Sequence, residues 1–301
     1  MRAIRFAEYG APSVLTVVET AVPEPGPGRI RVAVRAAGVN PIDVKVRSGS
    51  MSGGKPLAGP RGLGSEVSGT VDAVGDGVTD VAVGDAVAGW AVGGGYAEYA
   101  LMAVYAAKPD ALTWEQAAAL PVAGEAALRA LRALQPRKGE TLLINGASGT
   151  VGAIAAQLAV ADGVTVIGTA GPANLDRVGA LGAVATPYGA GLADRVRALA
   201  PQGVDAVLDA AGHGALPDAI ALRGGVDRVV TLADPAASEL GVPFLSGGAE
   251  DQTAEVLHTV LEAAAEGRIT PPAPQRMSLN EAAQAHEQLE KRGSGKLVLL
   301  P

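Results

Sequence analysis

A strand, a glycine-rich turn and a helix follow one another without interruption in the middle of this chain. Residues 140–152 read Glu-Thr-Leu-Leu-Ile-Asn-Gly-Ala-Ser-Gly-Thr-Val-Gly, and the helix-like run Ala-Ile-Ala-Ala-Gln-Leu-Ala fills 153–159. Small residues after a strand let the backbone come close to a pyrophosphate, and the N-terminus of the next helix turns free N–H groups and a partial positive charge towards it. This order predicts a dinucleotide-binding site in an α/β domain.

The turn departs from the usual G-x-G-x-x-G pattern, because Ala147 stands at the first glycine position. Such a pattern is weak evidence by itself. Here a second apolar strand, residues 164–169, follows the helix, as a βαβ unit requires. We therefore expect the turn to bind a cofactor rather than only to reverse the chain. The predicted cofactor contacts are Ala147, Ser148, Gly149, Thr150, Val151 and Gly152.

The end of the second strand predicts which cofactor binds. Enzymes that prefer NAD usually carry Asp or Glu about 20 residues past the first glycine position. Gly168, Thr169 and Ala170 stand there in this chain. Because no carboxylate stands there to repel a 2′-phosphate, and because the Thr169 hydroxyl can donate to that phosphate, the predicted cofactor is NADP. Arg177 and Tyr188 follow as further candidate contacts, although a solvated helix surface explains Arg177 equally well.

The length and hydropathy of the chain indicate roughly two ordinary domains in a soluble protein. The chain has 301 residues, 48% of them hydrophobic, yet it contains no apolar run of the length that crosses a bilayer. Glu8 lies where a signal peptide would be apolar. We therefore expect a cytoplasmic protein that is not associated with a membrane.

The charge and the cysteine content exclude several classes of function. A net charge of −7 without a cluster of Lys or Arg argues against nucleic acid as a partner. The absence of cysteine excludes disulfides, thiolate catalysis and cysteine-ligated metal sites. His213, His258 and His286 are widely spaced, which favours surface or packing roles over metal binding. The sequence therefore predicts no metal site.

The texture of the sequence changes near residue 114. Residues 1–110 alternate apolar and polar side chains between Gly/Pro turns, which is typical of a β-rich region. From there onward helices and strands alternate, which is typical of a doubly wound sheet. The predicted strands are 141–145, 164–169, 204–209, 227–232 and 296–300, and the predicted helices are 114–134, 174–181, 190–199, 250–266 and 280–291.

The predicted strands also place further residues near the cofactor. Ligands of open α/β sheets lie beyond the carboxyl ends of the strands, so Gly212, Leu232 and Ala233 should line the same crevice as the glycine turn. Ser278 is the predicted N-cap of the last helix. We expect the C-terminal tail to return to the first domain.

Seven segments, in order along the chain, carry a resemblance to a known family. They are Ala-Ala-Gly-Val-Asn-Pro-Ile-Asp (36–43), Gly-Ser-Glu-Val-Ser-Gly-Thr-Val-Asp-Ala-Val-Gly (64–75), Val-Gly-Asp-Ala-Val (83–87), Gly-Gly-Tyr-Ala-Glu-Tyr (94–99), Ala-Ala-Leu-Pro-Val-Ala-Gly (118–124), the glycine turn, and Gly-Lys-Leu-Val-Leu (295–299). In these segments the chain resembles the medium-chain dehydrogenase/reductase superfamily, in particular its zinc-independent quinone oxidoreductase branch.

The resemblance implies an α/β fold of two domains. A GroES-like β-barrel domain would comprise residues 1–117 and 249–301, and a doubly wound parallel-sheet Rossmann domain, residues 118–248, would bind NADP. The active site would lie in the cleft between them. The resemblance also implies a homodimer formed through an edge strand, for which residues 242–245 are the candidate. Pro243 suits an edge strand, because proline has no backbone N–H to donate and would leave a gap in the hydrogen bonds of a central strand.

Departures from zinc-dependent relatives indicate the reaction. Ser65 occupies the position of the histidine in their Gly-His-Glu motif, and no cysteine supplies the other zinc ligands. Without this Lewis acid, alcohol oxidation loses its main stabiliser. The resemblance therefore implies an enzyme that passes a hydride from NADPH to a quinone or an α,β-unsaturated carbonyl compound, acceptors that need orientation more than a strong acid.

The resemblance also suggests which residues act. Asn40 and Asp43 would face the nicotinamide, with Asn40 also contacting the cofactor. Lys45 would lie on the same strand face as Asp43, where many quinone reductases carry tyrosine. Lys296 resembles the family's closing lysine, which can approach the cofactor, although a surface position is equally compatible with the sequence. Asn40 before proline is also an ordinary turn signal, and Asp43 with Lys45 is also compatible with a solvated face.

Two other functions remain compatible with the sequence. One is metal-free carbonyl or alcohol redox chemistry. The other is a non-catalytic NADPH-binding protein with a structural or sensor role, since binding residues survive in proteins that have lost catalysis.

Overall fold

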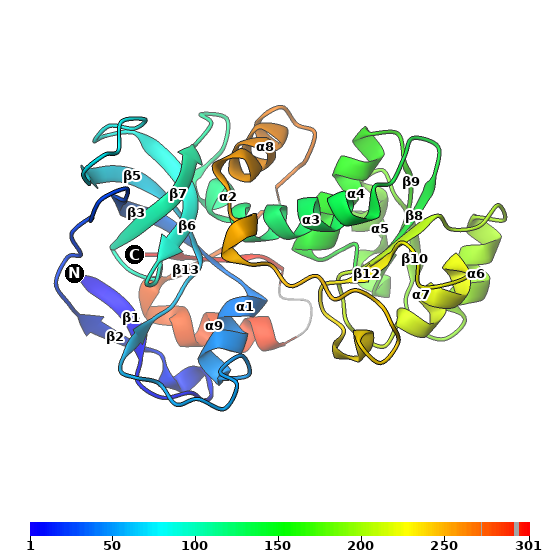
Figure 1. The fold of residues 1–301 in the computed structure, drawn as a ribbon, viewed down its shortest axis with the longest axis horizontal. Coiled ribbons are helices and arrows are strands. Elements are labelled where there is room, and N and C mark those ends of the chain that lie inside the picture. The colour runs from blue at the N-terminus through cyan, green and yellow to red at the C-terminus, as the bar shows by residue number, and fades with distance from the viewer. Residues whose placement is uncertain (272, 292–294) are drawn as a thin grey trace. The chain divides into compact units, whose positions relative to one another are not determined.

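The computed structural model describes residues 1–271, 273–291 and 295–301, which form two compact units (Figure 1). Unit 1 comprises Met1–Val122, Gln252–Ala265 and Pro271–Pro301, and unit 2 comprises Ala123–Asp251 and Glu266–Thr270. Both ends of the chain therefore belong to unit 1, as expected for the C-terminal tail. The domain limits at 117/118 and 248/249 remain a prediction.

Unit 1 is organised around β3 (Ile30–Val39), a strand of ten residues that pairs with three others. It pairs along its length with β5, at its N-terminal half with β7, and at its C-terminal half with β14. Because β5 also pairs with β6 and β6 with β7, these four strands close on themselves as a barrel. Ile30, Val32 and Val34 alternate inward and are buried, as period-two patterning requires.

Short helices and a second small sheet complete unit 1. The small sheet has the order β2-β1-β4. The remaining strands are β1 (Arg2–Phe6), β2 (Thr16–Glu19), β4 (Arg61–Gly62), β5 (Glu66–Val74), β6 (Ala86–Val92), β7 (Tyr99–Ala107), β13 (Gln275–Ser278) and β14 (Leu297–Leu300). The helices are α1 (Pro41–Ser48), α2 (Trp114–Ala118), α8 (Ala254–Ala265) and α9 (Ala282–Glu290), with 3₁₀ turns at Pro12–Val14 and Leu279–Glu281. Ser278 caps the second of these turns, just before α9, together with Glu281.

Unit 2 is built on a parallel sheet of five strands in the order β10-β9-β8-β11-β12. All five residues of the central strand β8 (Thr141–Asn145) are buried, as expected for a strand covered on both faces. The other strands are β9 (Thr165–Ala170), β10 (Val184–Pro187), β11 (Ala206–Asp209) and β12 (Val229–Thr231). The helices are α3 (Pro121–Leu134), which begins at the end of unit 1, α4 (Thr150–Ala161), α5 (Leu175–Gly179), α6 (Leu192–Leu199) and α7 (Leu216–Arg223), with 3₁₀ turns at Pro172–Asn174, Pro235–Ala237 and Ala249–Asp251. The predicted doubly wound α/β fold is confirmed.

The sequence prediction missed two elements of unit 2, β10 and α7. Strand β10 lies at the sheet edge, its first residue Val184 is 44% exposed, and it ends in Pro187, so it lacks the signature of a buried strand. Helix α7 has eight residues, as α6 has, but its apolar residues do not gather on one face, so it lacks a clear helical period.

Residues 242–245 extend the sheet beyond β12. The Thr231 N–H donates to the Pro243 carbonyl at 3.1 Å, and the Leu245 N–H donates to the Thr231 carbonyl at 2.9 Å. This segment therefore occupies the edge position where the sequence placed it, and Phe244 is 44% exposed there. Its role in dimerisation remains a prediction.

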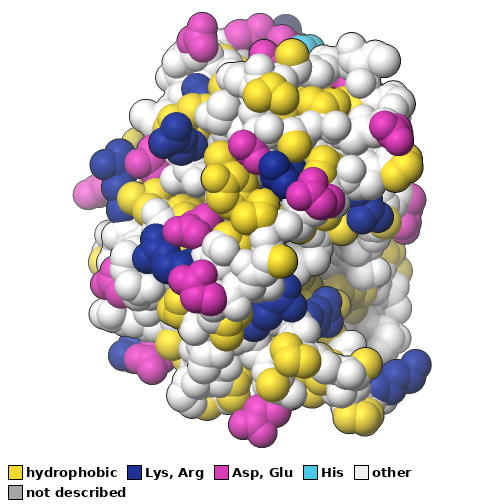
Figure 2. Space-filling model, turned by 90° about the vertical axis from the view of Figure 1, so that its left-hand side faces the viewer, with side chains coloured by type: hydrophobic (Ala, Val, Ile, Leu, Met, Phe, Trp, Pro, Cys, Tyr) yellow, Lys and Arg dark blue, Asp and Glu magenta, His cyan; other side chains and the backbone are white. Residues whose placement is uncertain are grey.

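The surface carries charges of both signs. On the face drawn in Figure 2, Lys and Arg side chains are interspersed with Asp and Glu side chains, and apolar side chains lie between them. In the described part of the chain, no helix combines the length and the apolar character needed to span a bilayer.

Substituting Gly38 with alanine tests the packing of β3 against its neighbours. A Cβ atom at residue 38 would lie 2.1 Å from Glu66 Oε1 and 2.6 Å from the Ala118 carbonyl oxygen, and the backbone atom cannot move aside cheaply. We expect Gly38→Ala to lower the free energy of unfolding, measured in urea, by about 1–3 kcal/mol. Gly59→Ala is the control, because its Cβ would meet nothing within 4 Å. Equal stability of the two variants would contradict this account of the packing.

Candidate functional site

The turn between β8 and α4 has the shape that the sequence predicted. Gly146 adopts a positive φ of 81°, and Gly149 is the N-cap of α4 without any side-chain cap. A Cβ atom at Gly152 would lie only 2.3 Å from the Gly146 carbonyl oxygen, so glycine is required where the helix meets the turn. The first N–H groups of α4 therefore stay free to meet an anion.

The side chains of the turn differ in their access to solvent. Ala147 and Gly152 are buried beneath the turn, whereas Ser148, Gly149, Thr150 and Val151 are partly or fully exposed. The six predicted contact residues thus form one continuous surface loop, with two packing positions and four open ones.

Thr169 supports this turn from the neighbouring strand β9. Its side chain is 2% exposed, its hydroxyl accepts the Gly146 N–H at 3.1 Å, and it donates to Asn145 Oδ1 at 3.4 Å. The Ala147 N–H donates to the Thr169 carbonyl at 3.0 Å. The Thr169 hydroxyl thus holds the turn in this structure. Its donation to a 2′-phosphate stays a prediction, and it would require the hydroxyl proton to leave Asn145.

Two other predicted contacts lie near the end of β9. The Tyr188 side chain is 62% exposed, and its ring and hydroxyl would lie 3.5 Å and 3.7 Å from a Cβ atom built on Gly171, in the loop after β9. Arg177 is exposed on α5 and forms no ion pair or hydrogen bond with any residue that the structure describes. A phenol and an unengaged guanidinium thus follow the strand end that carries no carboxylate.

The loops after β8, β11 and β12 touch one another. A Cβ atom at Gly146 would lie 3.0 Å from the Ala211 Cβ, and one at Gly212 would lie 2.6 Å from the Ala233 carbonyl oxygen. The Leu232 N–H donates to the Asp209 carbonyl at 2.9 Å. Gly212, Leu232 and Ala233 therefore lie in loops at the same end of the sheet as the glycine turn, and their contact with the cofactor stays a prediction.

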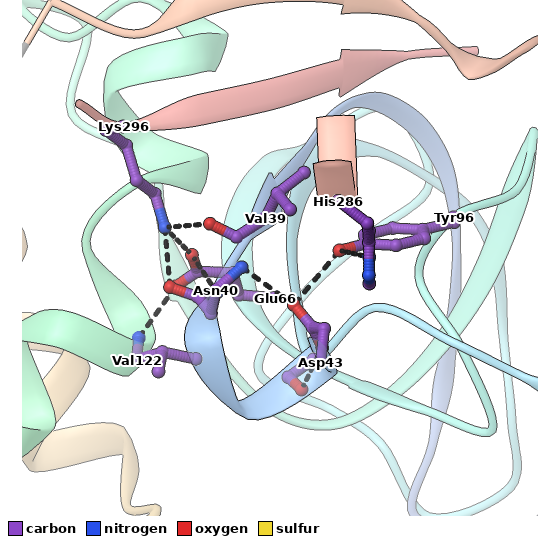
Figure 3. A network of polar contacts seen from close by, with 9 residues as sticks. Val39, Asn40, Asp43, Glu66, Tyr96, Val122, His286 and Lys296 are labelled. Atoms are coloured by element: carbon purple, nitrogen blue, oxygen red, sulfur yellow. Dashed lines mark hydrogen bonds and ion pairs between the residues drawn. The ribbon is translucent and has the colours of Figure 1, made fainter. Parts of the chain in front are cut away.

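In unit 1, Asn40 lies in a buried polar network (Figure 3). Its Nδ2 donates to Glu66 Oε1 at 2.7 Å, and its Oδ1 accepts from Lys296 Nζ at 2.7 Å. Lys296 Nζ also lies 2.6 Å from Glu66 Oε1 and 3.4 Å from the Val39 carbonyl oxygen. Glu66 Oε2 accepts the Val122 N–H at 2.7 Å. These contacts join β3, β5, β14 and the first turn of α3.

The network changes the interpretation of Lys296. Its side chain is 3% exposed and that of Glu66 is 0% exposed, so a surface position for the lysine is wrong. The ammonium has three N–H donors, and all three have acceptors in this network. A contact between Lys296 and a cofactor would therefore require one of these bonds to break. Glu66 is a structural polar residue, because both of its carboxylate oxygens are engaged within this network.

Asp43 is held by three hydrogen bonds. Its carboxylate accepts the Asn40 N–H at 2.9 Å, the Ser65 hydroxyl at 2.9 Å and the Tyr96 hydroxyl at 3.0 Å, and the residue is 1% exposed. Burial raises the pKa of Asp43 to about 6. Burial and the neighbouring carboxylate also raise the pKa of Tyr96 well above its usual value. Asp43 is therefore a carboxyl group that titrates close to neutrality inside unit 1.

His286, for which the sequence left a surface or a packing role open, completes this second part of the network. Its ring is fully buried, stands edge-on to the Tyr96 ring, and has Nε2 3.5 Å from the Tyr96 oxygen. Burial, together with the Arg47 charge, lowers the pKa of His286 to about 4. Arg47 is itself buried and is paired with Glu290. The packing role of His286 is confirmed, and no sequence motif reveals its contact with Tyr96.

Lys45 lies apart from these residues. Residues 41–48 form the helix α1, with Asn40 as N-cap and Asp43 completing a capping box, and not the strand expected from the sequence. Residues two positions apart on a helix do not share a face, so Lys45 is exposed while Asp43 is buried. The prediction of a common face for Asp43 and Lys45 is wrong, because Asn-Pro at residues 40 and 41 begins a helix here.

Removing the buried ammonium tests the network around Glu66. We expect Lys296→Met to lower the free energy of unfolding in urea by about 3–5 kcal/mol, because it leaves a buried carboxylate without its ionic partner. The double variant Lys296→Met with Glu66→Gln should recover part of this loss, since the unpaired charge is gone. Lys55→Met, at an exposed position, is the control. A double variant less stable than Lys296→Met alone would contradict the ion-pair account.

The buried imidazole predicts a pH dependence of stability. Because the pKa of His286 in the folded state lies below its usual value, its contribution is complete above about pH 6.5 and is lost as the pH falls towards about 4. Asp43, whose pKa is raised, acts in the opposite sense, losing its contribution as the pH rises through about 6. Between about pH 7 and pH 4.5, His286→Gln should remove about 2 kcal/mol of the acid-induced loss of unfolding free energy, measured in urea.

The matched control for this pH dependence is His258→Gln. His258 is 66% exposed on α8, so its replacement should leave the acid-induced loss unchanged. Identical pH profiles for His286→Gln and the wild type would show that His286 is not held neutral by burial.

Two family models match the chain. Residues 26–109 match the family model described as alcohol dehydrogenase GroES-like domain, and residues 181–299 match the model described as zinc-binding dehydrogenase. The chain is 34% identical to a quinone oxidoreductase of Rattus norvegicus, over 100% of this chain and 98% of the relative. It is 35% identical to a quinone oxidoreductase of Pseudomonas aeruginosa, over 99% of both chains.

Solved structures agree with this likeness. The quinone oxidoreductase of Escherichia coli, solved in complex with NADPH, is 27% identical, covers 100% of both chains, and superposes with a TM-score of 0.88. Matches of this extent cover both the barrel and the parallel sheet. This chain therefore belongs to the medium-chain dehydrogenase/reductase superfamily, in its quinone oxidoreductase-like branch.

Proposed function

We propose that this chain is an NADPH-dependent, zinc-free oxidoreductase that passes a hydride to a quinone or an α,β-unsaturated carbonyl compound. The observation that carries the proposal is the turn between β8 and α4. A Cβ atom at Gly152 would lie 2.3 Å from the Gly146 carbonyl oxygen, so only glycine fits there, and the first N–H groups of α4 are free. Relatives that are named quinone oxidoreductases, one of them solved with NADPH, support it.

The residues present fit a phosphorylated dinucleotide. The pyrophosphate would be held by the backbone of residues 147–152, which lies open at the start of α4. The 2′-phosphate would be met by Tyr188 beside Gly171 and by the unengaged guanidinium of Arg177, at a strand end without a carboxylate. NADPH, when bound, supplies the hydride.

The residues do not fit a catalytic zinc ion, although one matching family model is described as zinc-binding. The sequence contains no cysteine. Among the residues described, no group of three or more His, Asp or Glu side chains is placed to hold a metal ion. Asp43 meets Ser65 instead, and a serine hydroxyl is not one of the usual zinc ligands. No step of the proposed reaction is therefore assigned to a metal.

Residues that do not fit a zinc ion favour an acceptor that needs no Lewis acid. Quinones and enones already draw electrons, so their reduction depends mainly on orientation and on a hydrogen bond to the oxygen where negative charge develops. Asn40 and Asp43 contribute by holding the start of α1, because both side chains are buried and bonded within unit 1. Lys45 is exposed on a different face of α1. Of the two predicted catalytic residues that carry a charge, Lys45 is the one whose charge is accessible to a ligand, because Asp43 is buried.

We also propose that the protein is a cytoplasmic homodimer. The absence of cysteine agrees with a reducing compartment, where no disulfide is needed. The segment 242–245 at the sheet edge, with Phe244 44% exposed, is the proposed subunit contact.

The proposed reaction is tested by NADPH oxidation with a panel of quinones and enones. We expect turnover with at least one acceptor, faster with NADPH than with NADH, and unchanged after treatment with a chelator. Product analysis should find the saturated ketone, whereas an allylic alcohol would indicate carbonyl reduction. Protein that binds NADPH but transfers no hydride to any acceptor, artificial quinones included, would overturn the proposal in favour of a non-catalytic role.

A further inference from the structure

A buried carboxylate lies at the end of β11 without a cationic partner. Asp209 is 0% exposed, and none of the described Lys, Arg or His residues forms an ion pair with it. Its Oδ1 accepts the N–H groups of Ala211 and Gly212, both at 3.1 Å, and its Oδ2 accepts the Thr231 hydroxyl at 2.7 Å. Burying a carboxylate is costly, so the three donors that converge on it are what keep it there.

Thr231, at the end of β12, connects Asp209 to the backbone of the loop that follows β12. Its hydroxyl donates its one proton to Asp209 and accepts the N–H groups of Ala233 at 3.0 Å and Asp234 at 2.9 Å. The hydroxyl therefore has no hydrogen-bonding capacity left. One carboxylate and one hydroxyl fix the backbone of two loops, which also touch directly at Gly212 and Ala233.

The position of these loops in the sheet indicates which part of a dinucleotide they meet. The glycine turn follows β8, with β9 on one side and β11 and β12 on the other. The two halves of a dinucleotide lie on opposite sides of its pyrophosphate. If the ribose that carries the 2′-phosphate lies at the end of β9, the nicotinamide half extends over the loops after β11 and β12.

We propose that Asp209 and Thr231 form a positioning pair, which holds the backbone at Gly212 and Ala233 in place for the nicotinamide half of the cofactor. This inference rests on the proposed use of NADPH. The pair does not touch the cofactor; it sets the loops that do. A carboxylate is required at residue 209, because an amide would turn an N–H group towards at least one of the three donors.

The test compares two ligands that share the adenosine half. NADPH contains the nicotinamide, and 2′,5′-ADP does not. Dissociation constants of both are measured by titration calorimetry for the wild type, Thr231→Val, Thr231→Ser and Asp209→Asn. We expect Thr231→Val and Asp209→Asn to weaken NADPH binding about tenfold and to leave 2′,5′-ADP binding within about twofold. Thr231→Ser, which keeps the hydroxyl, should bind NADPH as the wild type does.

The comparison separates the failure of the pair from the failure of the cofactor assignment. Unchanged NADPH affinity in Thr231→Val, or an equal loss for both ligands, would overturn the role of the pair while the wild type still binds NADPH. Wild-type protein that binds neither ligand would overturn both proposals. Retained 2′,5′-ADP binding also shows that a variant is folded. If Asp209→Asn does not fold, Thr231→Val tests the pair, with Thr231→Ser as its control.

Discussion

The ion pair between Glu66 and Lys296 is the interaction on which unit 1 depends most. It is buried, and such a pair is favourable only when the remaining donors and acceptors are also satisfied. Asn40, the Val39 carbonyl and the Val122 N–H satisfy them. The same contacts fix the start of α1, and through it they orient the carboxylate of Asp43. The polar centre of unit 1 is therefore a consequence of how its own strands are joined.

Unit 2 also contains a buried carboxylate, but stabilises it in another way. Asp209 is as deeply buried as Glu66, yet its charge is met by backbone N–H groups and one hydroxyl instead of a cation. A carboxylate with a cationic partner ties together segments from distant parts of the chain. A carboxylate with backbone partners shapes the loop that follows it. The first arrangement suits a barrel made from both ends of the chain, and the second suits the edge of a sheet that carries a binding loop.

Much of the fold could be predicted from local sequence signals. Strand β8, the glycine turn and helix α4 are specified by a run of buried residues, by positions that tolerate no Cβ atom, and by alanine-rich sequence. A strand is expected where α1 lies, because the apolar and charged residues after Pro41 have no clear period. The helix is signalled by its start, where Asn40 and Asp43 form a capping box around Pro41. Edge strand β10 was missed because exposure removes the hydrophobic signal on which strand prediction depends.

The candidate site was less predictable, because its contacts join residues far apart in sequence. Sequence position alone cannot show that Lys296 reaches Glu66, or that His286 lies against Tyr96. Asp209 was within reach of sequence reasoning, since a carboxylate at the carboxyl end of a buried strand lies at the binding edge of a parallel sheet. Thr169 lies at the end of a buried strand as expected, but its hydrogen bonds to Gly146 and Asn145 could not be read from the sequence.

Glu66 and Lys296 are 230 residues apart in the sequence, and the whole of unit 2 lies between them. Bringing together the ends of so long a stretch of chain costs conformational entropy before the ion pair can form. Unit 2 is almost continuous in sequence, so its parallel sheet can form from contacts of shorter range. We therefore expect the sheet of unit 2 to fold before the barrel of unit 1 closes.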